Sequence, residues 1–205
     1  DLESYGKPLI FVDSNTLYLG HSCVTTDLED SVITALEHFL EHGHKEIGLL
    51  VGQEETADAT PLQMDPRQRA FQQFLTEKGL YEERFVAVGQ FSTESGYQMM
   101  EQLIQALGDD LPTAFFMASD AIAVGALRSL QEHQIAVPDR VSIISFNDTS
   151  IAKYVFPALS TVTVYTEEMG KQAIQMLRQT FQGSQPSVPY MVKLATKLTI
   201  RDSCR

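Results

Sequence analysis

The chain has 205 residues, of which 43% are hydrophobic, and its 15 lysines and arginines against 27 aspartates and glutamates give a net charge of −12. This apolar content suffices for a core in one large or two small domains, which excludes global disorder. The sequence contains no run of about 18 apolar residues, the length needed to span a membrane. It also contains no cluster of lysines and arginines that would bind nucleic acid. The first residues lack the pattern of an export signal. We therefore expect a cytoplasmic protein that does not bind DNA through this segment.

Short β-branched runs alternate along the chain with helical periodicity. The first run is followed by turn residues, and a capping-box pattern at Thr26–Glu29 then begins a helix that ends at Gly43. Further helices are expected at 65–79, 94–107, 120–133 and 167–181, and strands at 8–12, 47–52, 85–88, 113–117, 141–146, 160–164 and within 190–200. Because parallel strands need a covering crossover, this alternation predicts an α/β fold with doubly wound parallel sheets.

The cysteines and histidines do not indicate a bridge or a metal. Cys23 and Cys204 are too few for a disulfide scaffold, and we expect them to be reduced. His38 and His42 have the spacing of metal ligands on one helix face, but no third ligand is defined, because His44 follows the residue that ends the helix. We expect no metal and no other cofactor.

No motif of covalent catalysis is present. The sequence has no nucleophile elbow, no Walker loop and no dinucleotide-binding glycine motif. Carboxylates that could pair for acid and base catalysis stand where an α/β fold places strand ends and helix starts. We therefore expect a binding protein rather than an enzyme.

Polar side chains follow several of the predicted strands at the point where each strand ends. Asp13 follows the first strand, Arg67 opens the helix after the second, and Ser119, Asp120 and Asn147 follow later strands. The carboxyl ends of parallel strands face one crevice, so these groups are expected to converge there. Arginine forks, carboxylates and amides suit the hydroxyl groups of a sugar. For Asp120 a role as helix N-cap is equally open.

A set of motifs in a fixed order covers nearly the whole chain. It resembles the lactose/galactose repressor family of bacterial transcriptional regulators. The motifs are Pro-Leu-Ile-Phe-Val-Asp from residue 8, the segment 27–44 ending Glu-His-Gly-His, Arg-Gln-Arg-Ala-Phe from 67, Phe-Phe-Met-Ala-Ser-Asp-Ala-Ile-Ala-Val-Gly from 115, Val-Pro-Asp-Arg-Val-Ser-Ile-Ile-Ser-Phe-Asn-Asp from 137, Pro-Ala-Leu-Ser-Thr-Val from 157, Met169-Gly170 and the closing Leu-Thr-Ile-Arg-Asp-Ser-Cys. The ordered combination is far more specific than any single motif.

The resemblance implies an effector-binding core of two subdomains like those of periplasmic binding proteins of type I. Three crossings of the chain would fall near 44–45, 163–164 and 187–188. Residues 1–44 with 165–186 would form the N-terminal subdomain, and 45–164 with 187–205 the C-terminal subdomain. The helix-turn-helix headpiece and roughly the first βαβα portion of the N-terminal subdomain would lie outside this chain, so that the N-terminal subdomain is incomplete here.

The resemblance also implies roles for individual residues. Arg67 matches the arginine that clamps the effector. Ser119 stands where the family usually has asparagine, and Asn147 where it usually has an aspartate that accepts hydrogen bonds from sugar hydroxyls. Asn147 can donate as well as accept but carries no charge, so effector chemistry is expected to differ here.

Three further positions have two interpretations each. Asp27 and Asp30 match polar positions at the edge of the effector cleft, although the capping box explains them equally well. Val124 matches a dimer contact, while ordinary core packing is the alternative.

The function implied is that of a cytoplasmic, homodimeric transcriptional repressor. A sugar bound between the subdomains would change the operator affinity of the headpiece. The alternative is a periplasmic sugar-binding protein of a transporter, which has the same architecture. An export signal upstream, instead of a helix-turn-helix, would favour that alternative.

Overall fold

The computed structural model describes residues 6–53, 64–184 and 186–205. The chain forms two compact units, each built from separate stretches of sequence. Unit 1 contains Asp1–Asp27 and Val164–Thr196, and unit 2 contains Leu28–Thr163 and Lys197–Arg205. Each unit has a sheet of its own, so the two are described separately.

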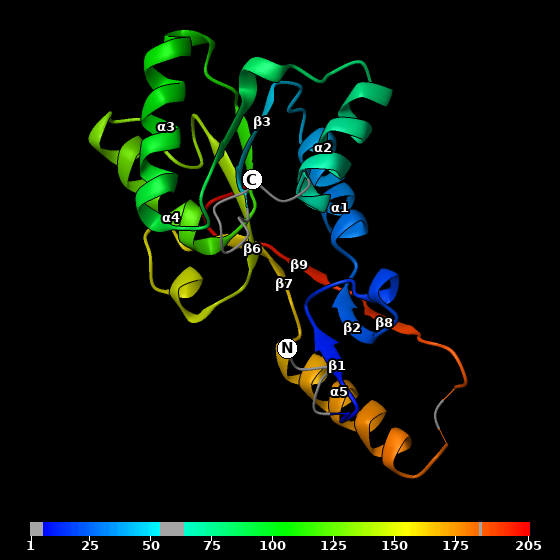
Figure 1. Ribbon diagram of the computed structural model, residues 1–205. Coiled ribbons are helices and arrows are strands. Elements are labelled where there is room, and N and C mark those ends of the chain that lie inside the picture. Colours follow the sequence, from blue (N-terminus) through cyan, green and yellow to red (C-terminus); the bar gives the residue numbers. More distant parts are fainter. Residues whose placement is uncertain (1–5, 54–63, 185) are drawn as a thin grey trace. The chain divides into compact units, whose positions relative to one another are not determined.

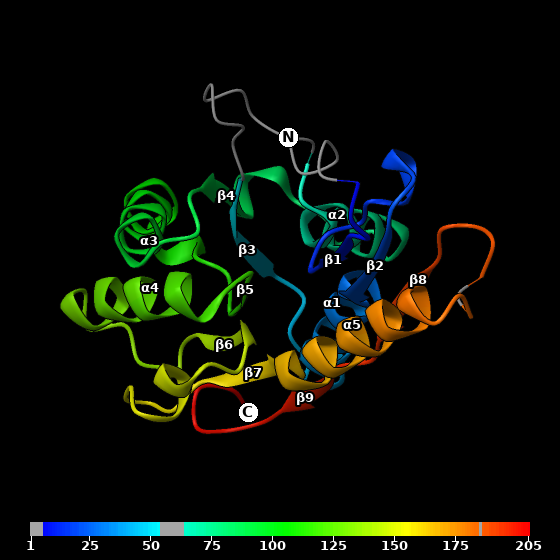
Figure 2. The same cartoon turned by 60° about the horizontal axis from the view of Figure 1, so that its bottom comes forward.

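Unit 2 is a doubly wound α/β layer structure around a six-stranded sheet of order β4-β3-β5-β6-β7-β9. All neighbouring strands are parallel except β7 and β9, which are antiparallel. The strands are β3 (Ile47–Gly52), β4 (Val86–Gly89), β5 (Ala114–Met117), β6 (Ser142–Asn147), β7 (Ser160–Thr163) and β9 (Lys197–Thr199). Helices α1 (Leu28–Glu41) and α2 (Pro66–Glu77) cover one face, and α3 (Thr93–Leu107) and α4 (Asp120–Glu132) cover the other (Figures 1 and 2).

The sequence explains this layering. All six residues of β3 are buried, as expected for a parallel strand covered on both faces. Helix α4 turns one apolar stripe toward the core, and this stripe contains Ile122, Ala123, Ala126, Leu127 and Leu130. The sheet and its helices thereby enclose a continuous core.

Two glycines bring α3 and α4 into backbone contact. A Cβ atom on Gly125 would lie 1.9 Å from the carbonyl oxygen of Thr93, and one on Gly96 would lie 2.2 Å from that of Ile122. Real Cβ atoms essentially never come this close, so any side chain at either position would force the helices apart.

The segment after β9 completes the sheet of unit 2. Ser203 is fully buried, and its hydroxyl donates to the Ile143 carbonyl at 2.8 Å and accepts from the Ser160 amide at 2.8 Å. Its own backbone accepts from the amide of Ile143 at 2.7 Å. The last residues of the chain therefore connect β6 with β7.

Unit 1 contains the parallel sheet β1-β2-β8, formed by β1 (Ile10–Val12), β2 (Ser22–Thr26) and β8 (Met191–Leu194). Helix α5 (Thr166–Phe181) packs against β1 and β2. The buried cluster between them consists of Val24, Met169, Ala173 and Met176. The chain also has short 3-10 helices, namely η2 (Leu17–Leu19), η3 (Glu83–Phe85), η4 (Gly108–Asp110) and η5 (Ser150–Lys153).

The expected fold class is confirmed, but β2 was not predicted. The sequence favoured a turn-rich stretch that led directly into a helix at Thr26, whereas Ser22–Thr26 is the central strand of unit 1. Thr26 ends this strand, and its hydroxyl contacts the sulfur of Met169 at 3.6 Å instead of capping α1. A short strand that mixes serine, threonine and cysteine with one valine has too little apolar pattern to be recognised.

The chain crosses between the units at other places than expected, except near residue 163. The expected crossing at 44–45 lies between Asp27 and Leu28, because α1 packs against α2, β5 and β9 of unit 2. The expected crossing at 187–188 lies between Thr196 and Lys197, because β8 pairs with β2. Strand β8 thus belongs to unit 1, and only β9 returns to unit 2.

Both cysteines are buried and free, as expected, with Cys23 in unit 1 and Cys204 in unit 2. Burial raises the pKa of the Cys204 thiol to about 11. The thiolate, which is the reactive form of cysteine, is therefore disfavoured at neutral pH. Within the described ranges, none of the helices combines the length and apolar character that crossing a membrane would need.

The histidines at the end of α1 lie close to one another. The rings of His38 and His42 are 4.1 Å apart between centroids, and His44 is directed elsewhere, with its Nδ1 2.9 Å from the Thr113 hydroxyl. Burial lowers the pKa of His38, with a further contribution from His42, and burial together with the other two histidines lowers the pKa of His44. Folding therefore favours the neutral form of both rings.

This arrangement predicts a loss of stability in mild acid. The unfolded state binds more protons once the pH falls below the ordinary histidine value of 6.5, so the stabilisation is complete above that pH and is lost below it. We expect the melting temperature to fall between pH 7.5 and 5.5, and to fall less in a His38→Gln/His44→Gln double variant. Thermal unfolding at several pH values measures this, and equal slopes for both proteins would contradict it.

Candidate functional site

Arg67 lies in the first turn of α2 and forms a closed pair with the residue that caps the helix. Asp65 is the N-cap, and its Oδ1 accepts from the Arg67 amide at 2.8 Å. The same carboxylate receives the guanidinium in bidentate fashion, from Nε to Oδ1 at 2.8 Å and from Nη2 to Oδ2 at 2.7 Å. The two side chains are only 12% and 10% exposed. The pair therefore holds the guanidinium in one orientation and compensates its charge.

The guanidinium is also held by the ends of three strands. Its Nη1 donates to the Ala118 carbonyl, directly after β5, at 2.8 Å. Its central carbon lies 4.8 Å from the ring centroid of Phe91, which follows β4, and 5.2 Å from that of Phe146 in β6. Arginine commonly stacks on aromatic rings in this way. Arg67 is thus the point at which the carboxyl ends of β4, β5 and β6 meet.

These contacts do not use all the N–H groups of the Arg67 guanidinium. A guanidinium has five N–H groups, and three are used by Asp65 and Ala118. The other two have no hydrogen-bond partner among residues 6–53, 64–184 and 186–205. A fixed fork with free donors beside an aromatic ring can bind vicinal hydroxyl groups, with the ring against the apolar face of a sugar.

Ser119 and Asn147 adjoin this cluster through the backbone. Ser119 follows Ala118, and its hydroxyl caps α4 by accepting from the Ile122 amide at 3.2 Å. Asn147 follows Phe146 and has a left-handed backbone with φ 107°. Three of the predicted side chains, Arg67, Ser119 and Asn147, are therefore connected around one end of the unit 2 sheet.

Asp120 is not the N-cap of α4, because Ser119 fills that role. The Asp120 carboxylate is buried and accepts four hydrogen bonds. Ser145 and Thr161 donate to Oδ1 at 2.5 and 3.1 Å, and the amide and hydroxyl of Thr149 donate to Oδ2 at 2.6 and 2.8 Å. Asp120 thereby ties β6, β7 and the loop after β6 together.

The remaining predicted residues lie elsewhere in the chain. Asp13 is in unit 1, exposed, with φ 62° and its amide bonded to the Val24 carbonyl at 2.9 Å. Asp30 is exposed in the first turn of α1, and Asp27 lies just before that helix, where Lys193 approaches its carboxylate at 3.5 Å. Val124 is half-buried on α4 and is not among the core residues of that helix.

Sequence reasoning missed the residues that shape the surroundings of Arg67, namely Asp65 as its ion-pair partner and Phe91 and Phe146 as its stacking partners. The sequence places Asp65 only at the start of the helix expected at 65–79. Gly52 gives Phe91 its room, since a Cβ atom there would lie 2.4 Å from the Phe91 ring. An aromatic residue just after a strand, with a glycine ending the neighbouring strand, is a signal that could have indicated this position.

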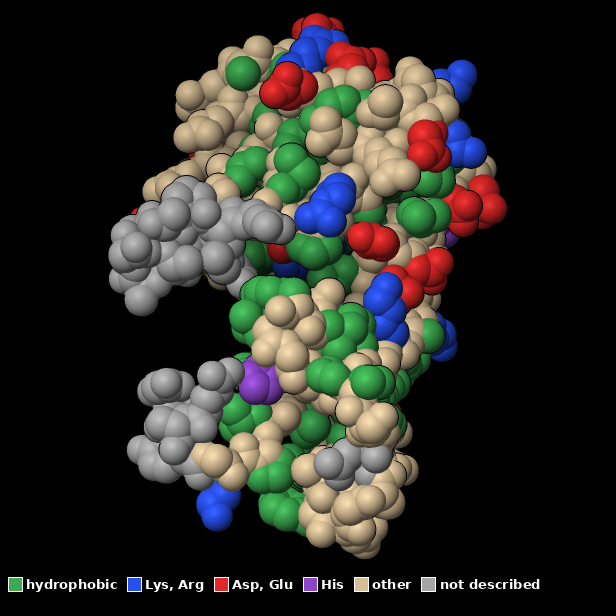
Figure 3. All heavy atoms as spheres, turned by 45° about the vertical axis from the view of Figure 1, so that its right-hand side comes forward, with side chains coloured by type: hydrophobic (Ala, Val, Ile, Leu, Met, Phe, Trp, Pro, Cys, Tyr) green, Lys and Arg blue, Asp and Glu red, His purple; other side chains and the backbone are tan. Residues whose placement is uncertain are grey.

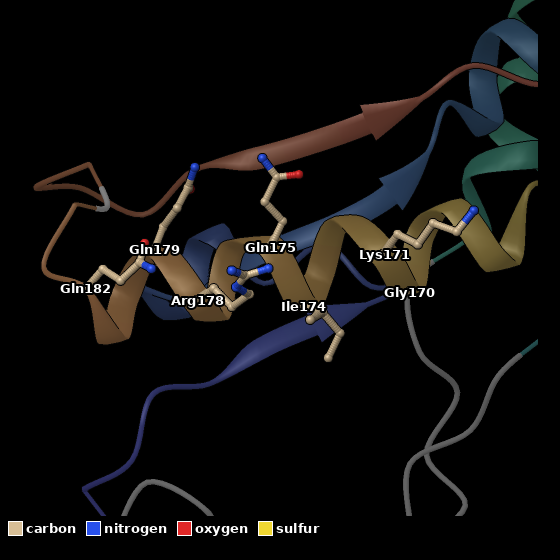
Figure 4. A pocket seen from close by; sticks show the side chains of 7 residues that line it. All are labelled: Gly170, Lys171, Ile174, Gln175, Arg178, Gln179 and Gln182. Carbon is tan, nitrogen blue, oxygen red and sulfur yellow. The ribbon is translucent and has the colours of Figure 1, made fainter.

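A separate hollow lies on the outer surface of α5 (Figure 4). It is lined by Gly170, Lys171, Ile174, Gln175, Arg178, Gln179 and Gln182. Six of these residues belong to α5 and Gln182 directly follows it, and none is a predicted effector residue. On the face shown in Figure 3, lysines and arginines are scattered, several of them beside acidic side chains, and do not form a patch.

Residues 36–204 match the family of periplasmic binding protein-like domains. The chain therefore belongs to this family, which fits the parallel-sheet unit and the strand-end site around Arg67. Its relatives confirm the resemblance to the lactose/galactose repressor family. It is 50% identical over 204 residues to the HTH-type transcriptional regulator GalR of Streptococcus thermophilus, covering 100% of this chain and 61% of that protein.

Two further comparisons agree. The HTH-type transcriptional repressor MelR of Bacillus subtilis is 32% identical over 198 residues, covering 95% of this chain and 56% of that protein. The solved complex of the transcriptional regulator CelR with cellobiose has a TM-score of 0.85 and 26% identity, covering 98% of this chain and 60% of that one. The chain thus spans about three fifths of the length of these proteins.

Proposed function

We propose that this chain is the effector-binding and dimerisation core of a cytoplasmic, sugar-responsive transcriptional repressor. The observation that carries the proposal is the Arg67 fork, which is held by Asp65, lies near the rings of Phe91 and Phe146, and has two N–H groups without a partner among the described residues. The names of the relatives support the regulatory role, and the CelR complex contains the sugar cellobiose. This role requires no covalent chemistry, metal or cofactor.

In this proposal the side chains make different hydrogen bonds to the sugar. Arg67 donates to adjacent hydroxyl groups, Asn147 both donates and accepts, and Ser119 supplies a hydroxyl. Asp13 and Asp30 provide acceptors; the support for Asp13 is its position directly after β1, and the support for Asp30 is the family resemblance. The four hydrogen bonds to Asp120 favour a supporting role for it over direct contact with the effector.

The closed pair of Arg67 and Asp65 favours a neutral sugar over a phosphorylated one. A buried cation that is already compensated offers hydrogen-bond donors but no net positive charge. Arg201, a further largely buried arginine at this end of the sheet, is likewise paired, with Asp148 at 2.7 Å. A phosphate group would have to be desolvated without a free cation to compensate it.

Sugar binding would act on DNA by shifting an equilibrium. An effector changes the population of two states only as far as it binds one of them better. Operator DNA would be contacted through a helix-turn-helix headpiece outside this chain. The relatives with HTH-type names weigh against the alternative of a transporter component.

A homodimer contact is proposed on the side of α4 that carries Val124. Tyr154 and Phe156 are 83% and 85% exposed, and the Phe156 carbonyl accepts from Gln131 of α4 at 2.8 Å. Exposed aromatic side chains beside a half-buried apolar helix position are typical of protein interfaces. This favours the dimer interpretation of Val124 over core packing.

We expect Phe156→Asp to weaken dimerisation, because a charge would be buried at the contact. The expected result is a shift from dimer to monomer, measured by sedimentation velocity at micromolar protein. Phe181→Asp, at a 73% exposed position on α5, serves as the control. A Phe156→Asp protein that remains dimeric would place the contact elsewhere.

The full-length protein tests the proposed function directly. Thermal unfolding is measured with a panel of neutral mono- and disaccharides and their phosphate esters, since a ligand of the native state raises the melting temperature. A sugar that stabilises the protein is then titrated into its complex with operator DNA. The proposal predicts stabilisation by a neutral sugar and release of the operator. If no sugar changes either quantity, the proposal is wrong.

A further inference from the structure

Asp148 follows Asn147 at the end of β6 and is held on both carboxylate oxygens. Arg201 donates from Nη2 to Oδ1 at 2.7 Å, and the Thr163 hydroxyl donates to Oδ2 at 2.9 Å. The side chains of Arg201 and Asp148 are 17% and 10% exposed. Both carboxylate oxygens of Asp148 are therefore engaged within the protein. This argues against Asp148 as a second effector-binding group beside Asn147.

Both partners of Asp148 stand where the chain changes units. Thr163 is the last residue of β7, and the chain enters unit 1 with the next residue. Arg201 follows β9, the strand with which the chain returns to unit 2 at Lys197. The hydroxyls of Thr163 and Thr199 also join these two strands, at 2.7 Å. One carboxylate thus connects the candidate effector loop with two of the three crossings.

The connection is held firmly. Arg201 also donates from Nη1 to the Leu159 carbonyl at 2.7 Å and from its amide to the Ser160 hydroxyl at 2.8 Å. Asn147 and Asp148 both have a left-handed backbone, with φ 107° and 57°. Such conformations persist only where neighbouring contacts fix them, and the contacts of Asp148 with Arg201 and Thr163 are contacts of this kind.

We propose that Asp148 is a positioning residue that transmits effector occupancy at Asn147 to the crossings after Thr163 and before Lys197. A hydrogen bond between the effector and Asn147 restrains the backbone of 147–148. That restraint alters the contacts of the Asp148 carboxylate with Thr163 and Arg201, and hence the strand ends that lead out of unit 2. The inference rests on the proposed function and adds the route by which the site acts.

The test uses the full-length protein and separates binding from transmission. Calorimetry measures the affinity for the sugar. Hydrogen exchange with and without sugar measures the response of the backbone at residues 161–166 and 194–199. The affinity for operator DNA, with and without sugar, measures the regulatory effect. In the natural protein the sugar is expected to change exchange in both segments. Asp148→Asn is expected to keep sugar affinity within about threefold while losing most of the ~5–150-fold change in operator affinity that allosteric effectors produce.

A second pair of variants guards against a folding defect. Thr163→Val removes the hydroxyl at nearly constant shape and is expected to lose the same response, whereas Thr163→Ser keeps the hydroxyl and the response. Asp139→Asn, at the 66% exposed partner of Arg205, is the control for the loss of one carboxylate. If Asp148→Asn and Thr163→Val bind sugar and respond like the natural protein, this inference is overturned. If no sugar binds the natural protein, the proposed function itself has failed.

Discussion

Arg67→Lys is expected to weaken sugar binding by about 2 kcal/mol or more, roughly 30-fold, because it removes one partner of a buried, hydrogen-bonded arrangement. Lysine keeps the charge beside Asp65 but has no planar fork, so it cannot hold the Asp65 carboxylate and the Ala118 carbonyl while presenting two further donors. It also loses the cation-π contacts of the guanidinium with the rings of Phe91 and Phe146. Calorimetric titration with the sugar identified in the thermal screen measures the change.

Arg69→Lys is the matched control, since Arg69 lies on the same helix turn but is exposed. Arg67→Ala is less suitable, because it would leave the buried Asp65 carboxylate without its partner and destabilise the fold by about 3–5 kcal/mol. Unchanged affinity in Arg67→Lys, with reduced affinity in the control, would place the binding site elsewhere.

Gly125→Ala is expected to destabilise unit 2 by about 3 kcal/mol or more, at the upper end of overpacking, because the obstructing atoms belong to the backbone. The new Cβ atom would meet the Thr93 carbonyl oxygen at 1.9 Å and the Tyr97 amide at 2.6 Å. No rotamer change relieves such a clash, so α3 and α4 must separate and open the core beneath them. Denaturant unfolding followed by circular dichroism measures the loss.

Gly170→Ala is expected to have the opposite effect on stability, although the substitution is the same. Gly170 is also helical, but a Cβ atom there would find no atom within 4 Å. Alanine is expected to stabilise α5 by about 0.5–1 kcal/mol through its better helix propensity. If both variants changed stability equally, close packing of the two helices would not be what makes Gly125 necessary.

The sequence predicted the elements whose signals are local. Strand β3 was expected at 47–52 and lies at Ile47–Gly52. This strand could be predicted because a continuous apolar run is recognised without knowledge of the strands beside it. The cap at Asp65 and the end of α2 near Gly79 follow equally from local chemistry. Strand β2 escaped prediction because its burial comes from β1, β8 and α5, which are distant in sequence.

The sequence predicted which residue types form the candidate site, but not the hydrogen bonds and ion pairs between them. Strand-end position identified Arg67, Ser119 and Asn147, since parallel strands share one functional edge. It could not indicate that Asp65 compensates Arg67 or that Asp120 is fully engaged by Ser145, Thr149 and Thr161. Those facts depend on side-chain geometry across segments that are far apart in the chain, and the crossing points depend on such contacts as well.

The return of the chain through β9 has a consequence for the order of folding during synthesis. Unit 2 is interrupted by residues of unit 1, and the Ser203 hydroxyl that bridges Ile143 and Ser160 is made after the second stretch of unit 1. Until β9 has been made, β7 presents an open sheet edge, which is a site for unwanted pairing. The two units therefore cannot mature one after the other as the chain emerges. Their completion is interleaved, and the edge of the larger unit is closed only after β8 of unit 1 has been made.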